Sequence, residues 1–341
     1  MTRLFGRELK VTIQEKSQVV YVWKNQRDIS DAYINAMDRK AGVKNVPADP
    51  EKVAIAYSSN SGGGRSYEYK NGKGFKISVS VDRVSSAQTP DSAVVKIWNA
   101  KDFPVLNSTD TRKLYLTITG GYAGLTGLLY AGDIILTDWG RDGADMIYTV
   151  QAGDGESLNR FEQFSQNTVH APNTNISGVL NDMINAFLKD GTQIVSDLKD
   201  KILAMFKGEK FTVKNIVKGD NLKKIEKILN KKGYQLVSTN GVLDLRKFYT
   251  ATNDPAIVLS PATGLIGSPK KKRVQRMVNQ KSVIKEGIDF ECLLIPGLFP
   301  GRKIKVDSEF IKGFFVIETV NYNADTFDEG IWTATGEAIQ L

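Results

Sequence analysis

The first half of the chain alternates apolar and polar residues with a period of two, which is the pattern of half-buried strands. In FKISVSVDRV, the side chains of Phe75, Ile77, Val79 and Val81 fall on one face and the polar residues between them fall on the other. LYLTIT repeats this pattern with Leu114, Leu116 and Ile118, and GDIILTDW and DMIYTVQAG follow with Gly-Asp or Asp-Gly turn signals nearby. These segments predict antiparallel strands joined by hairpins.

A polar interval between Trp23 and Phe75 interrupts the pattern. It contains SSNSGGGRS and YKNGKG, which are rich in turn-forming residues. We therefore expect an inserted loop over about 24–74, with a short helix around 29–40.

The middle of the chain changes to a helical period. In ISGVLNDMINAFLKD the apolar residues recur at i, i+3, i+4 and i+7, which predicts an amphipathic helix. Its apolar stripe consists of Ile176, Val179, Leu180, Met183, Ile184, Phe187 and Leu188. A second helix is expected around 193–206, with a stripe formed by Ile194, Leu198, Ile202 and Met205 or Phe206.

A third, lysine-rich helix is expected between Asp220, a favourable N-cap, and Gly233, a favourable stop. Its apolar side chains should face the protein, namely Leu222, Ile225, Ile228 and Leu229. Its lysines should stay in solvent or meet an acidic neighbour, namely Lys223, Lys224, Lys227 and Lys231. Strands then return in GVLDLRKF, GIDFECLLI, GRKIKVDS and KGFFVIETVNY. The order of elements predicts a β-rich α+β protein.

Composition places the chain among ordinary globular proteins, since 41% of its 341 residues are hydrophobic and 25% are charged. No apolar run is long enough for a membrane helix, and the N-terminal residues carry no secretory signal. The net charge of +8 is concentrated in residues 201–235 and 270–276, so the remainder is mildly acidic. A nucleic-acid binder usually presents a broad basic face. Local basic features are therefore favoured over binding of a specific nucleic acid.

One of these features, SPKKKRVQR at 268–276, is close to a nuclear import signal. Pro269 disfavours a helix at Ser268, and the like charges repel one another, which predicts an extended, solvated loop away from any central channel. A contact with an acidic neighbouring subunit and a contact with nucleic acid are the alternatives. The exposed cations would be Lys270, Lys271, Lys272, Arg273 and Arg276.

Candidate catalytic residues are few. His170 is the only histidine and no serine or cysteine motif points to it, while one histidine and one cysteine cannot build a usual zinc site. Cys292 sits in apolar surroundings and is expected to be buried. The glycine-rich GGYAGLTG lacks the features of a phosphate loop and predicts a hairpin. We therefore expect no enzyme activity, no cofactor and no metal.

A cluster of carboxylates follows this region and consists of Asp138, Asp142, Asp145, Asp154 and Glu156. Their spacing is not that of a calcium loop. Turn residues are the favoured interpretation, and a pair of glycosidase acids stays open.

Residues 211–237, FTVKNIVKGDNLKKIEKILNKKGYQLV, resemble the opening of a LysM repeat, with a short strand followed by Lys-Gly-Asp-x-Leu at the start of a helix. This resemblance implies, as an alternative function, a module that binds or degrades peptidoglycan.

The succession of motifs along the whole chain resembles the central baseplate hub of contractile phage tails, of the Mu-like and T-even type. The N-terminal motifs are LFGRELKVTI, FKISVSVDR, TPDSAVVKIWNAKD, LYLTITGGYAG, LLYAGDI and DMIYTVQAGDG, and the C-terminal motifs are LSPATGLIGSP, LLIPGLFPGRKIKV and KGFFVIETVNYNADTF. The residues that match the family pattern include Ile97, Trp98, Asn99, Gly121, Tyr122, Gly132, Asp133, Gly153, Asp154 and Gly155. In the C-terminal motifs we single out Gly264, Gly267, Pro296 and Gly301. Tight turns and ring contacts are the roles expected of the glycines and their neighbours.

The resemblance implies two tail-tube-like antiparallel β-barrel domains, at 1–155 and 240–341, flanking a helical or mixed region at 156–239. It implies a homotrimer that adapts the six-fold tail tube to the three-fold spike and also contacts the tape-measure protein. Such a protein is assembled in the bacterial cytoplasm, does not insert into membranes, and resides in the virion. The long interval before Phe75, Trp98-Asn99-Ala100, and the lengthened connection after GLIGSP depart from the family pattern.

Overall fold

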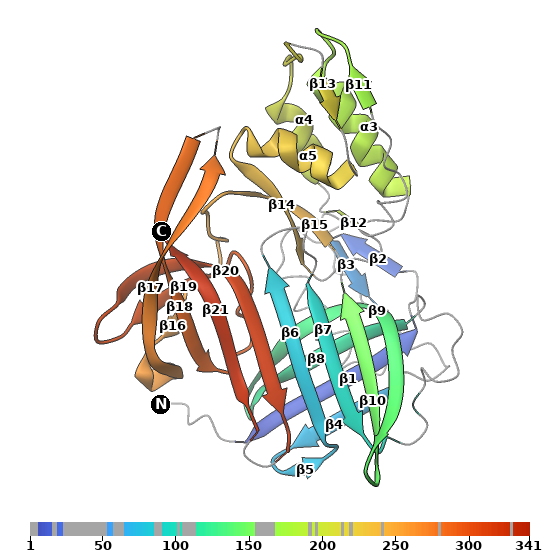
Figure 1. The fold of residues 1–341 in the computed structure, drawn as a ribbon, viewed down its shortest axis with the longest axis vertical. Helices are drawn as coiled ribbons and strands as arrows, with labels where there is room; N and C mark the ends of the chain where they lie inside the picture. The colour runs from blue at the N-terminus through green and yellow to red at the C-terminus, as the bar shows by residue number, and fades with distance from the viewer. Residues whose placement is uncertain are drawn as a thin grey trace.

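Strand pairing joins most of the described chain into one long sheet (Figure 1). The computed structural model describes residues 6–15, 19–22, 53–56, 65–84, 91–100, 103, 114–153, 168–189, 193–194, 197–212, 215–217, 221–239, 242–278, 281–327 and 330–341. The predicted helix at 29–40 lies outside these residues.

The main sheet has 14 strands. Its path runs through β17 (Leu265–Val278), β18 (Lys281–Leu293), β21 (Trp332–Gln340), β20 (Lys312–Asp325), β6 (Ile77–Val84), β7 (Ser92–Trp98), β10 (Asp145–Gly153), β9 (Leu125–Asp142), β8 (Leu114–Tyr122), β1 (Arg7–Glu15), β4 (Arg65–Lys70) and β5 (Lys73–Gly74). Off this path, β19 (Lys303–Asp307) pairs with β20 and, in parallel, with β16 (Ile257–Leu259). The 3₁₀ helix η4 (Pro261–Thr263) connects β16 to β17, and β2 (Val19–Val22) pairs with β3 (Val53–Ala56).

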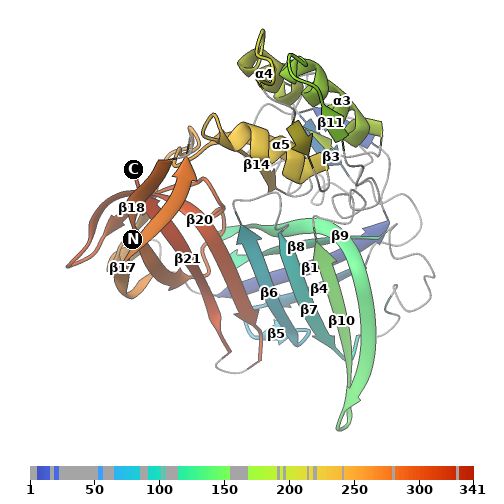
Figure 2. The ribbon, with the colours of Figure 1, turned by 45° about the horizontal axis from the view of Figure 1, so that its top comes forward.

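The long strand β9 carries the sheet from one layer to the other. Its first half pairs with β8 and its second half with β10, with Asp133 at the crossing point. Figures 1 and 2 show β6, β7 and β10 in front of β8 and β1. The main hydrophobic core contains side chains from both of these layers. The predicted alternation of buried and polar side chains in β6 is confirmed, since Ile77, Val79 and Val81 are at most 2% exposed.

The N-terminal and C-terminal strands meet where β6 pairs with β20, from Ser78 opposite Asp325 to Val84 opposite Thr319. Thr326 reinforces this junction, because its Oγ1 accepts a hydrogen bond from the Ile77 N–H at 2.7 Å. The strand path of the described residues is open, since β17 and β5 at its ends do not pair with each other. The β-rich α+β class is confirmed, whereas most of the described strands of the two predicted β domains lie in one continuous sheet, in which no closed barrel is seen. The boundaries at 155 and 240 stay a prediction.

Part of the expected inserted loop is a hairpin. β4 pairs with β1 and turns into β5 through Asn71 and Gly72, both with positive φ. An Asn-Gly step between strand-forming residues is a strong hairpin signal. Residues 65–74 were therefore wrongly assigned to a loop, and so was Val53–Ala56, which forms β3.

The helical region contains α3 (Ile176–Lys189), α4 (Leu198–Met205) and α5 (Asn221–Asn230). It also contains the pair β11 (Thr168–His170) and β13 (Asn215–Val217), and a small sheet of β12 (Gln193–Ile194), β15 (Val242–Lys247) and β14 (Tyr234–Thr239). A second core holds the three helices, β14 and β15 together and includes Tyr115, Leu128 and Ala131 from β8 and β9. The helical region thus packs against the face of β8 and β9 that points away from the main core.

The helices follow their predicted stripes with two exceptions. Leu198 and Ile202 are buried in α4 as expected, but Ile194 lies in β12, because residues 193–194 pair with β15 instead of extending the helix. In α5 the apolar stripe is buried as predicted, and Gly233, with φ of 79°, follows the helix end. Lys224, however, is only 1% exposed and not in solvent. The helix buries a wider arc than its apolar residues alone define.

Candidate assembly surfaces

The basic run lies in the edge strand β17 and is not a loop. Lys270 stands opposite Asp289 of β18, and Arg273 stands opposite Glu286. Successive residues of a strand point to opposite faces. Alternation therefore separates neighbouring cations, and the acidic residues of β18 offset their repulsion, which is why the run can pair as a strand.

Lys272 is the cation that the sheet neutralises. Its Nζ lies 2.8 Å from Asp289 Oδ1 and 2.6 Å from Glu337 Oε1. Partial burial opposes its charge, but the two carboxylates outweigh this effect and raise the pKa of Lys272. Lys270, Lys271 and Arg273 are exposed, and the side chain of Arg276 lies outside the described residues.

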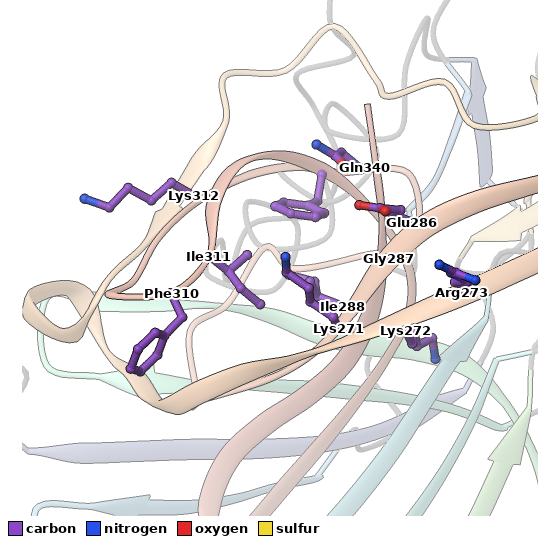
Figure 3. Close-up of a pocket in the computed structure, with 11 residues that line it drawn as sticks. Lys271, Lys272, Arg273, Glu286, Gly287, Ile288, Phe310, Ile311, Lys312 and Gln340 are labelled. Atoms are coloured by element: carbon purple, nitrogen blue, oxygen red, sulfur yellow. The ribbon is translucent and has the colours of Figure 1, made fainter.

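A pocket opens beside this strand (Figure 3). Its volume is about 570 Å³. Phe310, Ile311 and Lys312 lie on one side, and Arg273 and Glu286 lie on the other. The remaining lining includes Lys271, Ile288 and Phe315. The pocket therefore combines apolar side chains with a surplus of cations.

The β9–β10 hairpin projects beyond the neighbouring strands of the sheet (Figures 1 and 2). Leu136 and Trp139 on it are 50% and 56% exposed. Asp142 stands opposite Asp145 across the turn, and Asp138 lies within β9. Two of the clustered acids thus flank a turn as predicted, Asp138 does not, and Asp154 and Glu156 lie outside the described residues.

A third surface gathers apolar side chains at the turns beside β6 and β20. Phe75, Phe327 and Ile331 are 36%, 54% and 62% exposed. The Nζ of Lys76 lies 4.4 Å from the ring centroid of Trp98 and 4.0 Å from that of Phe327. Phe75 was expected on the buried face, but it precedes β6 and its backbone oxygen instead accepts a hydrogen bond from Thr326 at the junction.

The N-terminal motif glycines occupy strands as well as turns. Gly121 has φ of 144°, and a Cβ there would lie 2.2 Å from the backbone oxygen of Leu125, so the β8–β9 hairpin requires glycine. Tyr122 beside it is buried. Gly132 and Asp133 were expected at a turn but lie inside β9, because β8 pairs with Gly132 and Asp133, and β10 pairs with β9 from Asp133 onward. Gly153 ends β10, and Asp154 and Gly155 lie outside the described residues.

The C-terminal motif residues are dispersed. Gly264 follows η4 with φ of 105°, and Gly267 has φ of 63° at the irregular start of β17. Pro296 approaches Gly127, where a Cβ would lie 2.8 Å from the proline Cβ. Gly301 lies against the Arg246 guanidinium. The structure does not bring the motif residues into one site, and their role in ring contacts stays a prediction.

Cys292 and His170, the two residues considered for catalysis, take part in packing contacts. Cys292 is fully buried, and this burial raises the pKa of its thiol to about 12. The His170 ring stacks on Phe211 at 5.5 Å between centroids. Within the described residues no group of three or more His, Cys, Asp or Glu side chains could hold a metal ion. None of the described helices is long and apolar enough to span a membrane.

The LysM-like segment forms a strand, a helix and a strand, β13, α5 and β14. Its two strands belong to different sheets, since β13 pairs with β11 and β14 pairs with β15. Its helix packs into the second core. The described contacts of this segment are thus strand pairing and core packing within the protein.

By sequence, no protein-family model and no curated protein matches the chain. Solved structures do match in fold. The Escherichia coli c3393 protein, a component of the type VI secretion system described as similar to the T4 phage tail proteins gp27 and gp5, aligns with a TM-score of 0.53 and 14% identity over 78% of this chain and 74% of that one. This chain shares the fold of the c3393 protein.

Two further structures have the same fold. The tail protein from Neisseria meningitidis MC58 aligns with a TM-score of 0.50 and 10% identity, over 82% of this chain and 94% of its own. A chain of the lidded Francisella PdpA–VgrG complex aligns with a TM-score of 0.52 and 8% identity, over 98% of this chain and 53% of its own. At these identities the likeness concerns the fold alone.

Proposed function

We propose that this chain is a structural baseplate protein of a phage tail, and specifically the hub that joins the six-fold tail tube to the three-fold central spike. The observation that carries the proposal is the fold shared with the c3393 protein over about three quarters of both chains. The order of motifs such as LYLTITGGYAG and LLIPGLFPGRKIKV supports it independently of the fold.

Symmetry explains why such a hub would be a trimer. A chain with two tube-like regions, present three times, offers six similar surfaces to the tube and three to the spike. Closed rings are the usual form of such assemblies. The pairing of β6 with β20 would hold the two regions of each copy in a fixed relation. The exposed apolar turns at Phe75, Phe327 and Ile331 are a suitable surface for one neighbour.

The proposed partners are further copies of this chain, the tail tube protein, the spike protein and the tape-measure protein. The proposed role is structural, without enzyme activity or a cofactor. Cys292 is consistent with this, because a thiol with a pKa of about 12 is not a nucleophile at neutral pH.

Co-purification tests this function. The tagged chain should retain the tail tube and spike proteins when they are co-expressed. Phe327→Asp together with Ile331→Asp should reduce retention of one of them. Lys227→Asp on the exposed side of α5 together with Lys231→Asp in the exposed turn after it should not. Binding to purified peptidoglycan sacculi, or release of fragments from them, without any retention of tail proteins would favour the cell-wall alternative instead.

A further inference from the structure

The β9–β10 hairpin and the pocket beside β17 have complementary chemistry. The hairpin presents Trp139 at 56% exposure and Leu136 at 50%. Around them the segment 136–147 carries three aspartates against one arginine. Tryptophan is a typical interface anchor that fills an apolar pocket, and the aspartates near it favour a partner surface of positive charge.

The pocket is such a recess. Ile288, Ile311 and Phe315 contribute its apolar lining. Lys271 and Arg273 are exposed beside it. Lys272, which lies between them in the sequence, is already paired with Asp289 and Glu337. Phe310, at 72% exposure, extends the apolar surface outward.

The two features lie at opposite ends of the molecule. In both views β17 and β18 lie at the left, and the tip of the β9–β10 hairpin lies at the lower right (Figures 1 and 2). One copy therefore cannot place its own hairpin in its own pocket. Two copies can join head to tail, and repetition of such a contact with a closing rotation produces a ring.

We propose that the β9–β10 hairpin of one copy docks into the pocket beside β17 of the next copy. Trp139, on one face of the hairpin, packs against Phe310, Ile311 and Phe315 in the pocket. Asp138 and Asp142, which alternation places on the other face of the hairpin, pair with Lys271 and Arg273. Only one part of this inference rests on the proposed function, namely that repeated contacts close into a ring. The contact itself follows from charge and exposure at the two surfaces.

Sedimentation velocity of the full chain over a range of concentrations tests the contact. Reversing the hairpin with Asp138→Lys and Asp142→Lys, or the pocket with Lys271→Glu and Arg273→Glu, should weaken self-association at least about tenfold. Combining all four changes in one chain should restore it, because the charges are again complementary. Trp139→Ala should also weaken association at least about tenfold.

The control carries Lys227→Glu on the exposed side of α5 and Lys231→Glu in the exposed turn after it, which changes the net charge as much as the pocket reversal does. It should associate like the wild type, and circular dichroism should show that every variant is folded. A wild-type chain that is monomeric at the highest soluble concentration would overturn the proposal. So would a fourfold variant that associates no better than the two reversals, or a pocket reversal that leaves self-association unchanged.

The outcomes separate this inference from the proposed function. If the chain retains tail proteins but the reversals leave self-association unchanged, the docking contact is wrong and the hub function stands. If the reversals act as expected but no tail protein is retained, the docking contact stands and the hub function is wrong.

Discussion

The buried ion pair between Arg83 and Asp91 offers the sharpest test of the main core. Arg83 Nε lies 3.0 Å from Asp91 Oδ2, and the two side chains are 3% and 1% exposed. Asp91 Oδ1 also accepts the Val84 N–H at 2.9 Å, and Arg83 Nη1 donates to the Leu129 backbone oxygen at 3.4 Å. The pair therefore links β6, the start of β7, and β9.

Asp91→Asn keeps an acceptor for the Val84 N–H but leaves the buried guanidinium of Arg83 without its carboxylate. Removing one partner of a buried pair costs about 3–5 kcal/mol. We expect the free energy of unfolding to fall by about 3 kcal/mol for Asp91→Asn, and by about 1 kcal/mol more for Asp91→Ala, which also removes the acceptor. Urea unfolding followed by tryptophan fluorescence measures both.

Asp307→Asn is the matched control, because Asp307 pairs with Lys312 at 3.2 Å with both side chains more than half exposed. Its effect should stay within about 0.5 kcal/mol. An Asp91→Asn variant as stable as this control would refute the reasoning. Additive losses in the double variant Arg83→Met/Asp91→Ala would do the same, since residues of one pair should be coupled.

Three further changes test other parts of the fold. Ile225→Ala removes a fully buried side chain of the second core and should cost about 2–5 kcal/mol, seen as faster amide exchange in α5, whereas Lys227→Gln should change nothing. Lys272→Gln should lower the free energy of unfolding by about 1 kcal/mol, measured in urea at pH 7. Because the folded protein raises the pKa of Lys272, the stabilisation by this lysine should persist at neutral pH and be lost only as the pH rises through the raised pKa. Asp244→Asn should be neutral or stabilising by up to about 1 kcal/mol at pH 7, because burial raises the pKa of this carboxyl. Wild type and variant should converge as the pH falls below the ordinary value of 3.8.

Local periodicity was enough to predict the elements whose pattern is set by one buried face. The stripe of α5 and the alternation of β6 are examples, since each residue's burial follows from its position in a regular repeat. The hairpin at Gly121 was predictable for a similar reason, because a tight turn needs a residue that tolerates positive φ.

Predictions failed where a distant partner decides the structure. The run at Lys270–Arg273 forms a strand because β18 supplies Asp289 and Glu286 across from it, which no local charge count can reveal. Gly132 stays within a strand because it pairs with Leu116 of β8, and β10 takes up the pairing at the next residue, Asp133. The pairing of β6 with β20 joins segments more than 200 residues apart and has no signature in either one.

The candidate surfaces were only partly predictable. The exposed cations of the basic run could be named from charge alone, and the carboxylates around Trp139 were noted as a cluster. The exposure of Trp139 could not be predicted, because its strand alternates like a buried one and only the projection of the hairpin beyond the sheet leaves it in solvent.

The position of this chain in assembled tails tests the central claim most directly. A cryo-electron-microscopy map of purified tails, with the chain marked by a fused tag, should show three copies around the tail axis between the tube and the spike. A location on the tail periphery, or a copy number other than three on the axis, would contradict the account.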